Sequence, residues 1–171
     1  MNSLQVVSSS RFLLFATWFV AITSVPSAAL YQQGLDAGTK PSAIHTPYDS
    51  STFVLNIALI AAWITTSRWL SSIPGVPRGV VWWGWIVPVA SLFVPRRVIG
   101  RAIGDRIERG QINLWWGCWV GFNVVANLGL AESLVSATPI NPIKPAYEIA
   151  AACLLTGSYF TWRRIVATLS S

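Results

Sequence analysis

Four long apolar stretches, separated by shorter polar ones, dominate the hydrophobic pattern of this chain. They cover residues 12–31, 52–70, 112–131 and 146–166. An α-helix of about 20 apolar residues is long enough to cross the roughly 30 Å hydrocarbon core of a bilayer. The pattern therefore predicts an all-α membrane protein with four transmembrane helices, forming one domain over residues 1–171.

A fifth apolar stretch, residues 80–95, is too short to be another span. A helix over residues 80–94 reaches only roughly 22 Å, and Pro88 interrupts it while Pro95 follows it. Irregular backbone at membrane depth survives where protein or water covers it. We therefore expect residues 80–95 to form a re-entrant or interfacial segment with the other helices packed around it.

Residues 96–109 carry a different, helical pattern. Val98, Ile99 and Ile103 recur on one side, and Arg97 and Arg101 lie on the other. This spacing predicts a short amphipathic helix between the second and third spans, lying at the membrane interface with its arginines toward anionic lipid. An alternative is a charged connector whose arginines only set the membrane topology.

The distribution of basic residues predicts the orientation. Arg11, the five arginines of residues 96–109 and the Arg163-Arg164 pair all fall on one side of a four-span chain, whereas the other two loops hold only Lys40 and Lys144. Basic residues accumulate on the cytoplasmic side of membrane proteins. We expect a multi-pass protein with both termini and residues 80–109 in the cytoplasm.

The first span has a second interpretation as a secretory signal. Arg11 precedes an apolar run that ends in Ser27-Ala28-Ala29, which is similar to a signal-peptidase site. Cleavage there would remove one helix and leave the orientation of the others unchanged.

Composition fits the membrane class and excludes several others. Of 171 residues, 53% are hydrophobic and only 11% are charged, with a mean hydropathy of +0.53. The net charge of +6 does not predict nucleic-acid binding, because the arginines cluster between apolar spans, where anionic headgroups are the nearer partner. Cys118, Cys153 and His45 form no ligand pattern, so we expect no metal and no cofactor, and a disulfide between the two cysteines stays open.

No catalytic motif is present in the sequence, so we expect a non-enzymatic protein that acts by interaction. Its partners would be membrane lipids with anionic headgroups or a membrane protein, and a homo-oligomer stays open. The expected contact residues are Trp82, Trp83, Trp85, Pro88, Pro95, Arg96, Arg97, Arg101, Trp115 and Trp116.

Two amides in the third span support an alternative function. Asn123 and Asn127 are four residues apart and share a helix face, where they could line the polar cavity of a small transporter or channel component. The structural explanation of the same residues is hydrogen bonding between helices.

One protein family shares the spacing of the rarer residues. Trp82, Trp85, Pro88 and Pro95, then Arg96-Arg97-Val98-Ile99, then Trp115-Trp116 give a pattern that resembles the bacterial membrane family called domain of unknown function 4328. The resemblance covers about residues 50–165. It implies a multi-helix fold in the bacterial cytoplasmic (inner) membrane, and it implies no known activity.

Overall fold

The computed structural model describes residues 3–40, 43–73, 76–84, 93–104, 107–135 and 144–170. These residues contain six helices and no strand, which confirms the all-helical class. The helices are α1 (Ser3–Asp36), α2 (Pro47–Ser71), α3 (Arg78–Trp83), α5 (Val94–Ile103), α6 (Arg109–Val135) and α7 (Pro145–Ser170). Each of the four long helices contains one of the predicted spans and extends beyond it.

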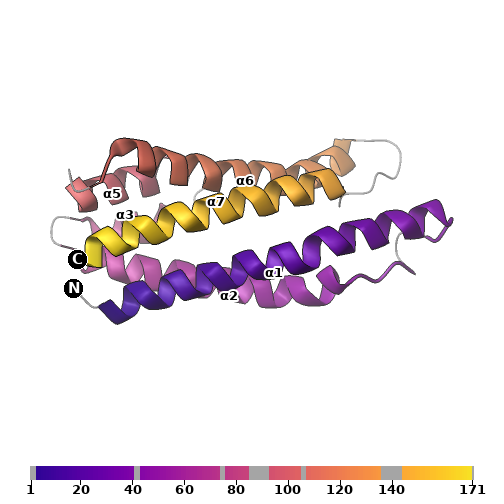
Figure 1. The fold of residues 1–171 in the computed structure, drawn as a ribbon, viewed down its shortest axis with the longest axis horizontal. Coiled ribbons are helices and arrows are strands. Elements are labelled where there is room, and N and C mark those ends of the chain that lie inside the picture. The colour runs from indigo at the N-terminus through magenta and orange to yellow at the C-terminus, as the bar shows by residue number, and fades with distance from the viewer. Residues whose placement is uncertain are drawn as a thin grey trace.

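Each long helix runs antiparallel to the long helix that precedes or follows it in the chain, so α1 and α6 share one direction and α2 and α7 share the other (Figure 1). Both chain termini lie at one end of the bundle together with α3 and α5, and the α1–α2 and α6–α7 connections lie at the other. We call the first of these the arginine-rich end. Helix α1 packs against α2 and α7, and α7 also packs against α6. The cross-section is therefore a bent row, α2–α1–α7–α6, with α2 and α6 as its outer members.

Two helices are long and apolar enough to cross a membrane among the described residues, one over Ser8–Asp36 and one over Phe53–Ser71. This finding supports the first two of the four predicted spans. Helices α6 and α7 are not among the candidate spans found over the described residues.

Small side chains allow α1 to approach its two neighbours closely. Such residues are typical of helix contacts in membrane proteins, where backbones pack at short range. The fully buried small residues of α1 are Ser9, Ala16, Ser24, Ser27 and Ala28. Hydroxyl groups here also bond within the helix, since Ser24 donates to the Val20 carbonyl at 2.5 Å.

Two hydrophobic clusters form the core. The smaller one lies between α1, α2 and α7 and contains Ala16, Val20, Leu55, Ala58 and Leu155. The larger one joins α2, α3, α5, α6 and α7 at the arginine-rich end. Its buried members are Trp69, Leu70, Val81, Val98, Ile99, Ile107, Ile112, Trp115, Trp116, Trp162, Ile165 and Val166.

Indole rings hold the larger cluster together. Trp162 of α7 lies between Trp69 of α2, in an edge-to-face arrangement with centroids 5.9 Å apart, and Trp115 of α6, at 5.2 Å. Trp115 also contacts Trp116 at 5.5 Å. Aromatic pairs at these separations contribute about 0.5–1.5 kcal/mol each beyond their buried area.

Candidate functional site

Helix α5 is amphipathic, as its sequence predicts, but its apolar side contacts protein. Pro95, Val98 and Ile99 are buried, and Val98 and Ile99 belong to the large aromatic cluster. Its bounds also differ from the predicted 96–109, because the helix ends at Ile103 and Gly104 follows with a φ of 60°. Glycine adopts that left-handed conformation readily. Only the arginine side of α5 therefore stays available to a partner.

The arginines of α5 point away from the bundle. Arg96, Arg97 and Arg101 are exposed, and none of them forms an ion pair with a described residue. Further exposed arginines belong to the same end, at positions Arg11, Arg68, Arg78, Arg109, Arg163 and Arg164. Among the described residues at this end, the exposed acidic residue is Glu108. This end of the molecule is strongly cationic.

One of these arginines has a fixed position. Arg96 Nε donates a hydrogen bond to Asn113 Oδ1 at 2.9 Å, which links α5 to the first turns of α6. Asn113 was not predicted as a site residue. Its position could have been noticed in the sequence, because Asn113 shares one helix face with Trp116, Val120 and Asn123 at spacings of three and four residues.

The predicted tryptophans have different surroundings. Trp82 of α3 is half-buried and meets Trp63 of α2 edge to face at 5.6 Å, while Trp83 is 66% exposed. Trp115 and Trp116 are buried in the large cluster. Trp85 and Pro88 lie outside the described residues, as does half of the predicted re-entrant segment, residues 85–92.

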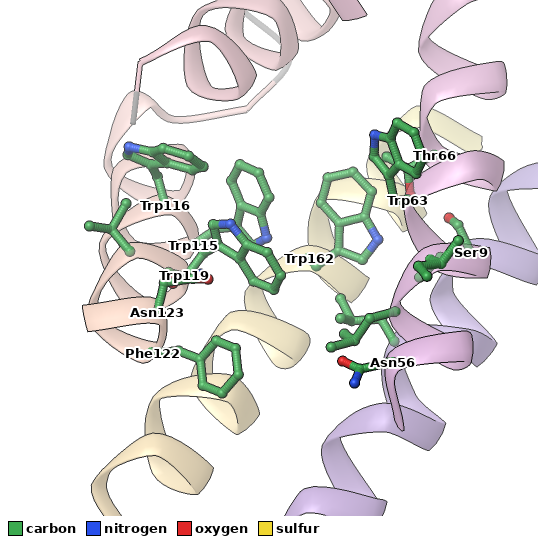
Figure 2. Close-up of a pocket in the computed structure, with 15 residues that line it drawn as sticks. Ser9, Asn56, Trp63, Thr66, Trp115, Trp116, Trp119, Phe122, Asn123 and Trp162 are labelled. Atoms are coloured by element: carbon green, nitrogen blue, oxygen red, sulfur yellow. The ribbon is translucent and has the colours of Figure 1, made fainter. Parts of the chain in front are cut away.

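A cavity of about 400 Å³ lies between α2 and α6, with α1 and α7 behind it (Figure 2). We call it the aromatic groove. It is partly open, and three of its lining residues, Asn56, Ile60 and Asn123, are exposed. Its aromatic lining consists of Trp63, Trp115, Trp116, Trp119, Phe122 and Trp162.

The two α6 amides that were predicted to line a cavity bond within their own helix. Asn123 Nδ2 donates to the Trp119 carbonyl at 2.8 Å, and Asn127 Nδ2 donates to the Asn123 carbonyl at 2.7 Å. Asn123 lines the aromatic groove and Asn127 does not. The second amide of the groove is Asn56 of α2, on the opposite wall (Figure 2). The spacing of residues along α6 could not predict this pairing, because it depends on how α2 and α6 pack in the bundle.

A polar cluster fastens the opposite end of the α6–α7 hairpin. Lys144 forms an ion pair with Glu132, and the Tyr147 hydroxyl donates to the other carboxylate oxygen at 2.5 Å. The hydrogen bond from Lys144 holds the pKa of Glu132 below its usual range, and Tyr147 acts in the same direction. The bond to Glu132 in turn raises the pKa of Lys144. These contacts hold the two helix ends together.

The described residues include no group of three His, Cys, Asp or Glu side chains that could hold a metal ion. Cys118 and Cys153 are both free thiols, so the disulfide left open by the sequence is not formed.

Comparison with protein-family models, with curated proteins and with solved structures gives no match to this chain. The resemblance to domain of unknown function 4328 stays a prediction. Function is therefore inferred from the arginine-rich end and the aromatic groove alone.

Proposed function

We propose that this chain is a four-span membrane protein that binds anionic lipid through its arginine-rich end, without catalysing a reaction. The proposal rests on the different surroundings of the two sides of α5. Its apolar side is buried in the bundle, so Arg96, Arg97 and Arg101 are held outward on a docked helix. Each Lys or Arg near an anionic membrane surface contributes about 1 kcal/mol of attraction.

The lengths of the helices support four spans. Helices α6 and α7 contain 27 and 26 residues, or roughly 40 Å each at the rise of an α-helix. They lie antiparallel beside α1 and α2. The basic residues gather at one end, which under the positive-inside rule is the cytoplasmic one. With the resemblance noted above, we place the protein in the bacterial inner membrane.

Thiol labelling in intact cells tests this topology. Single cysteines would be placed at Thr39, Gly110, Val135 and Thr168 in a background lacking Cys118 and Cys153, because these four positions are exposed. An impermeant maleimide should label positions 39 and 135 in intact cells, and 110 and 168 only after permeabilisation. If only α1 and α2 cross, position 135 will be protected and the four-span proposal is wrong.

Lipid selectivity tests the function itself. The protein would be reconstituted with spin-labelled phosphatidylglycerol or phosphatidylcholine, and the motionally restricted fraction of each lipid measured. The double variant Arg97→Gln/Arg101→Gln should lose about tenfold or more of its preference for phosphatidylglycerol, at about 1 kcal/mol per charge. The matched variant Arg97→Lys/Arg101→Lys keeps the charge and should keep most of the preference. Equal selectivity in the Gln variant and the wild type would refute the proposal.

One observation favours a second candidate, a small transporter component. Asn56 and Asn123 place amides on opposite walls of the aromatic groove, which could hydrate a path for a solute. Cysteine at position 123 distinguishes the two functions. A small hydrophilic thiol reagent should react there if water fills the groove, and should not react if lipid occupies it.

A further inference from the structure

The face of α6 that lines the aromatic groove continues beyond the groove to Asn113, which binds Arg96 of α5. Trp116, Val120 and Asn123 line this wall and lie three or four residues apart, so they share one helix face. Asn113 is the preceding member of the same stripe and is exposed. It accepts the hydrogen bond from Arg96 Nε at 2.9 Å. Neither Asn113 nor Arg96 lines the groove, and the bond holds the guanidinium one helical turn from Trp116, the lining residue nearest to it along the stripe.

That guanidinium retains its capacity to bind an anion. Arginine has five N–H donors in a planar fork, and the bond to Asn113 uses the one on Nε. Arg96 is exposed and forms no ion pair with a described residue, so its two terminal amino groups remain available. Such a fork matches the oxygens of a phosphate and forms charge-assisted hydrogen bonds with them.

The groove below Arg96 has the opposite chemistry. Its walls are mainly aromatic rings, with Trp116 on the α6 side, Trp63 on the α2 side and Trp162 of α7 between them in the view of Figure 2. A volume of about 400 Å³ lies within the range of small-molecule sites. Tryptophan prefers the interfacial depth of a bilayer, where the glycerol and the first chain carbons of a lipid lie. The exposed Ile60 at the groove places its open side toward the surrounding acyl chains in a membrane.

We propose that the aromatic groove is a binding site for one anionic glycerophospholipid, with its phosphate on Arg96 and the upper part of one acyl chain between α2 and α6. This inference rests on the proposed function and makes it specific. The remaining arginines attract anionic lipid in general, whereas Arg96 and the groove select a single molecule. The site is preorganised, because the burial of Val98 and Ile99 fixes the helix that carries Arg96.

Two matched pairs of variants test the site by native mass spectrometry, with phosphatidylglycerol titrated onto the protein and the bound molecules counted. Arg96→Gln and Arg97→Gln each remove one charge from adjacent exposed positions. A hydrogen-bonded phosphate contact is worth about 1.5–3 kcal/mol, so Arg96→Gln should weaken the first binding event about tenfold or more, and Arg97→Gln only about two- to fivefold. Asn113→Ala keeps every charge but releases Arg96, and should give an intermediate loss.

The second pair fills the groove. Val120→Trp adds an indole inside it, whereas Val124→Trp adds the same group one turn along α6 at a position that is 53% exposed and outside the lining. We expect the first to abolish the single tight phosphatidylglycerol site and the second to keep it. Circular dichroism and thermal unfolding of both variants show whether each is folded, and Arg96→Gln tests the site independently.

Each outcome separates the specific site from the general function. Equal losses in Arg96→Gln and Arg97→Gln, or tight binding retained in folded Val120→Trp, would refute the site while leaving general lipid attraction intact. Unchanged phosphatidylglycerol preference in Arg97→Gln/Arg101→Gln would refute the general function, even if one groove-bound lipid persists. Displacement of the lipid by water-soluble glycerol phosphate at equal concentration would show that the groove contributes nothing to binding.

Discussion

Replacing Ile99 with alanine removes the most deeply buried side chain of α5 from the large cluster. Ile99 is 0% exposed. Truncation of a buried isoleucine to alanine costs about 2–5 kcal/mol, depending on how far the surroundings collapse into the cavity. The better helix propensity of alanine returns only a few tenths of a kcal/mol. If α5 is docked through this side chain, its undocking equilibrium should therefore increase about 30-fold to several thousand-fold.

Amide hydrogen exchange measures that equilibrium directly, because protected amides exchange when a segment opens locally. Peptides covering residues 94–103 of the reconstituted protein would be followed by mass spectrometry. The matched control is Arg97→Ala, which places the same residue on the exposed side of the same helix. Surface substitutions change stability by about 0.5 kcal/mol at most, so the control should alter exchange by no more than about threefold.

The two variants separate a docked helix from one that lies in lipid. If the apolar side of α5 faced the membrane, alanine at position 99 would leave no cavity in the protein. Exchange in Ile99→Ala that stays within threefold of the control would refute the docked arrangement. It would also remove the basis for a fixed Arg96.

Three further results are expected. Trp162→Ala should lower the free energy of unfolding by about 3–5 kcal/mol in a denaturation experiment, because the ring is 2% exposed and contacts two other indoles. A loss below about 1 kcal/mol would contradict the assignment of Trp162 to the core. Gly84→Ala should destabilise the protein by about 1–3 kcal/mol, because the added Cβ would clash with neighbouring atoms. Gly79→Ala should be neutral or stabilising, because Gly79 has open space around it. Equal melting temperatures of the two variants would count against the close packing at Gly84. The pKa of Glu132 is lowered in the folded protein, so its stabilising contribution is present above the unfolded pKa and is lost as the pH falls through the lowered value. When thermal unfolding is followed between about pH 7 and pH 3, Glu132→Gln should therefore lose less stability than the wild type. Parallel pH profiles of the two proteins would exclude the ion pair with Lys144.

The positions of the long helices could be predicted from the sequence because each follows from local hydrophobicity. The predicted span 112–131 lies within α6, and 146–166 lies within α7. Hydropathy over the described residues supports the first two helices as candidate spans. The antiparallel arrangement with both termini at one end follows from the short connections.

What could not be predicted is which surfaces meet. The periodicity of residues 96–109 shows that α5 has an apolar side. It does not show whether Ile99 on that side contacts protein or lipid. Gly104 did carry a readable signal for the end of α5, since its positive φ suits glycine. Trp63 of α2 and Trp116 of α6 are more than fifty positions apart, and they line the same cavity only because α1 and α7 pack between their helices.

The bent-row cross-section has a consequence for how the protein is made. The α1–α2 and α6–α7 hairpins each pair neighbours in the chain, so each can form as soon as its second helix has been synthesised. The contact between α1 and α7 joins the two hairpins, and α7 follows every other helix in the sequence. In the proposed four-span protein, the two hairpins can therefore insert into the membrane as independent units, with docking of α7 onto α1 as the final step. In the proposed four-span arrangement, the aromatic groove between α2 and α6 forms only when the two hairpins dock, so its lipid enters at that step or after it.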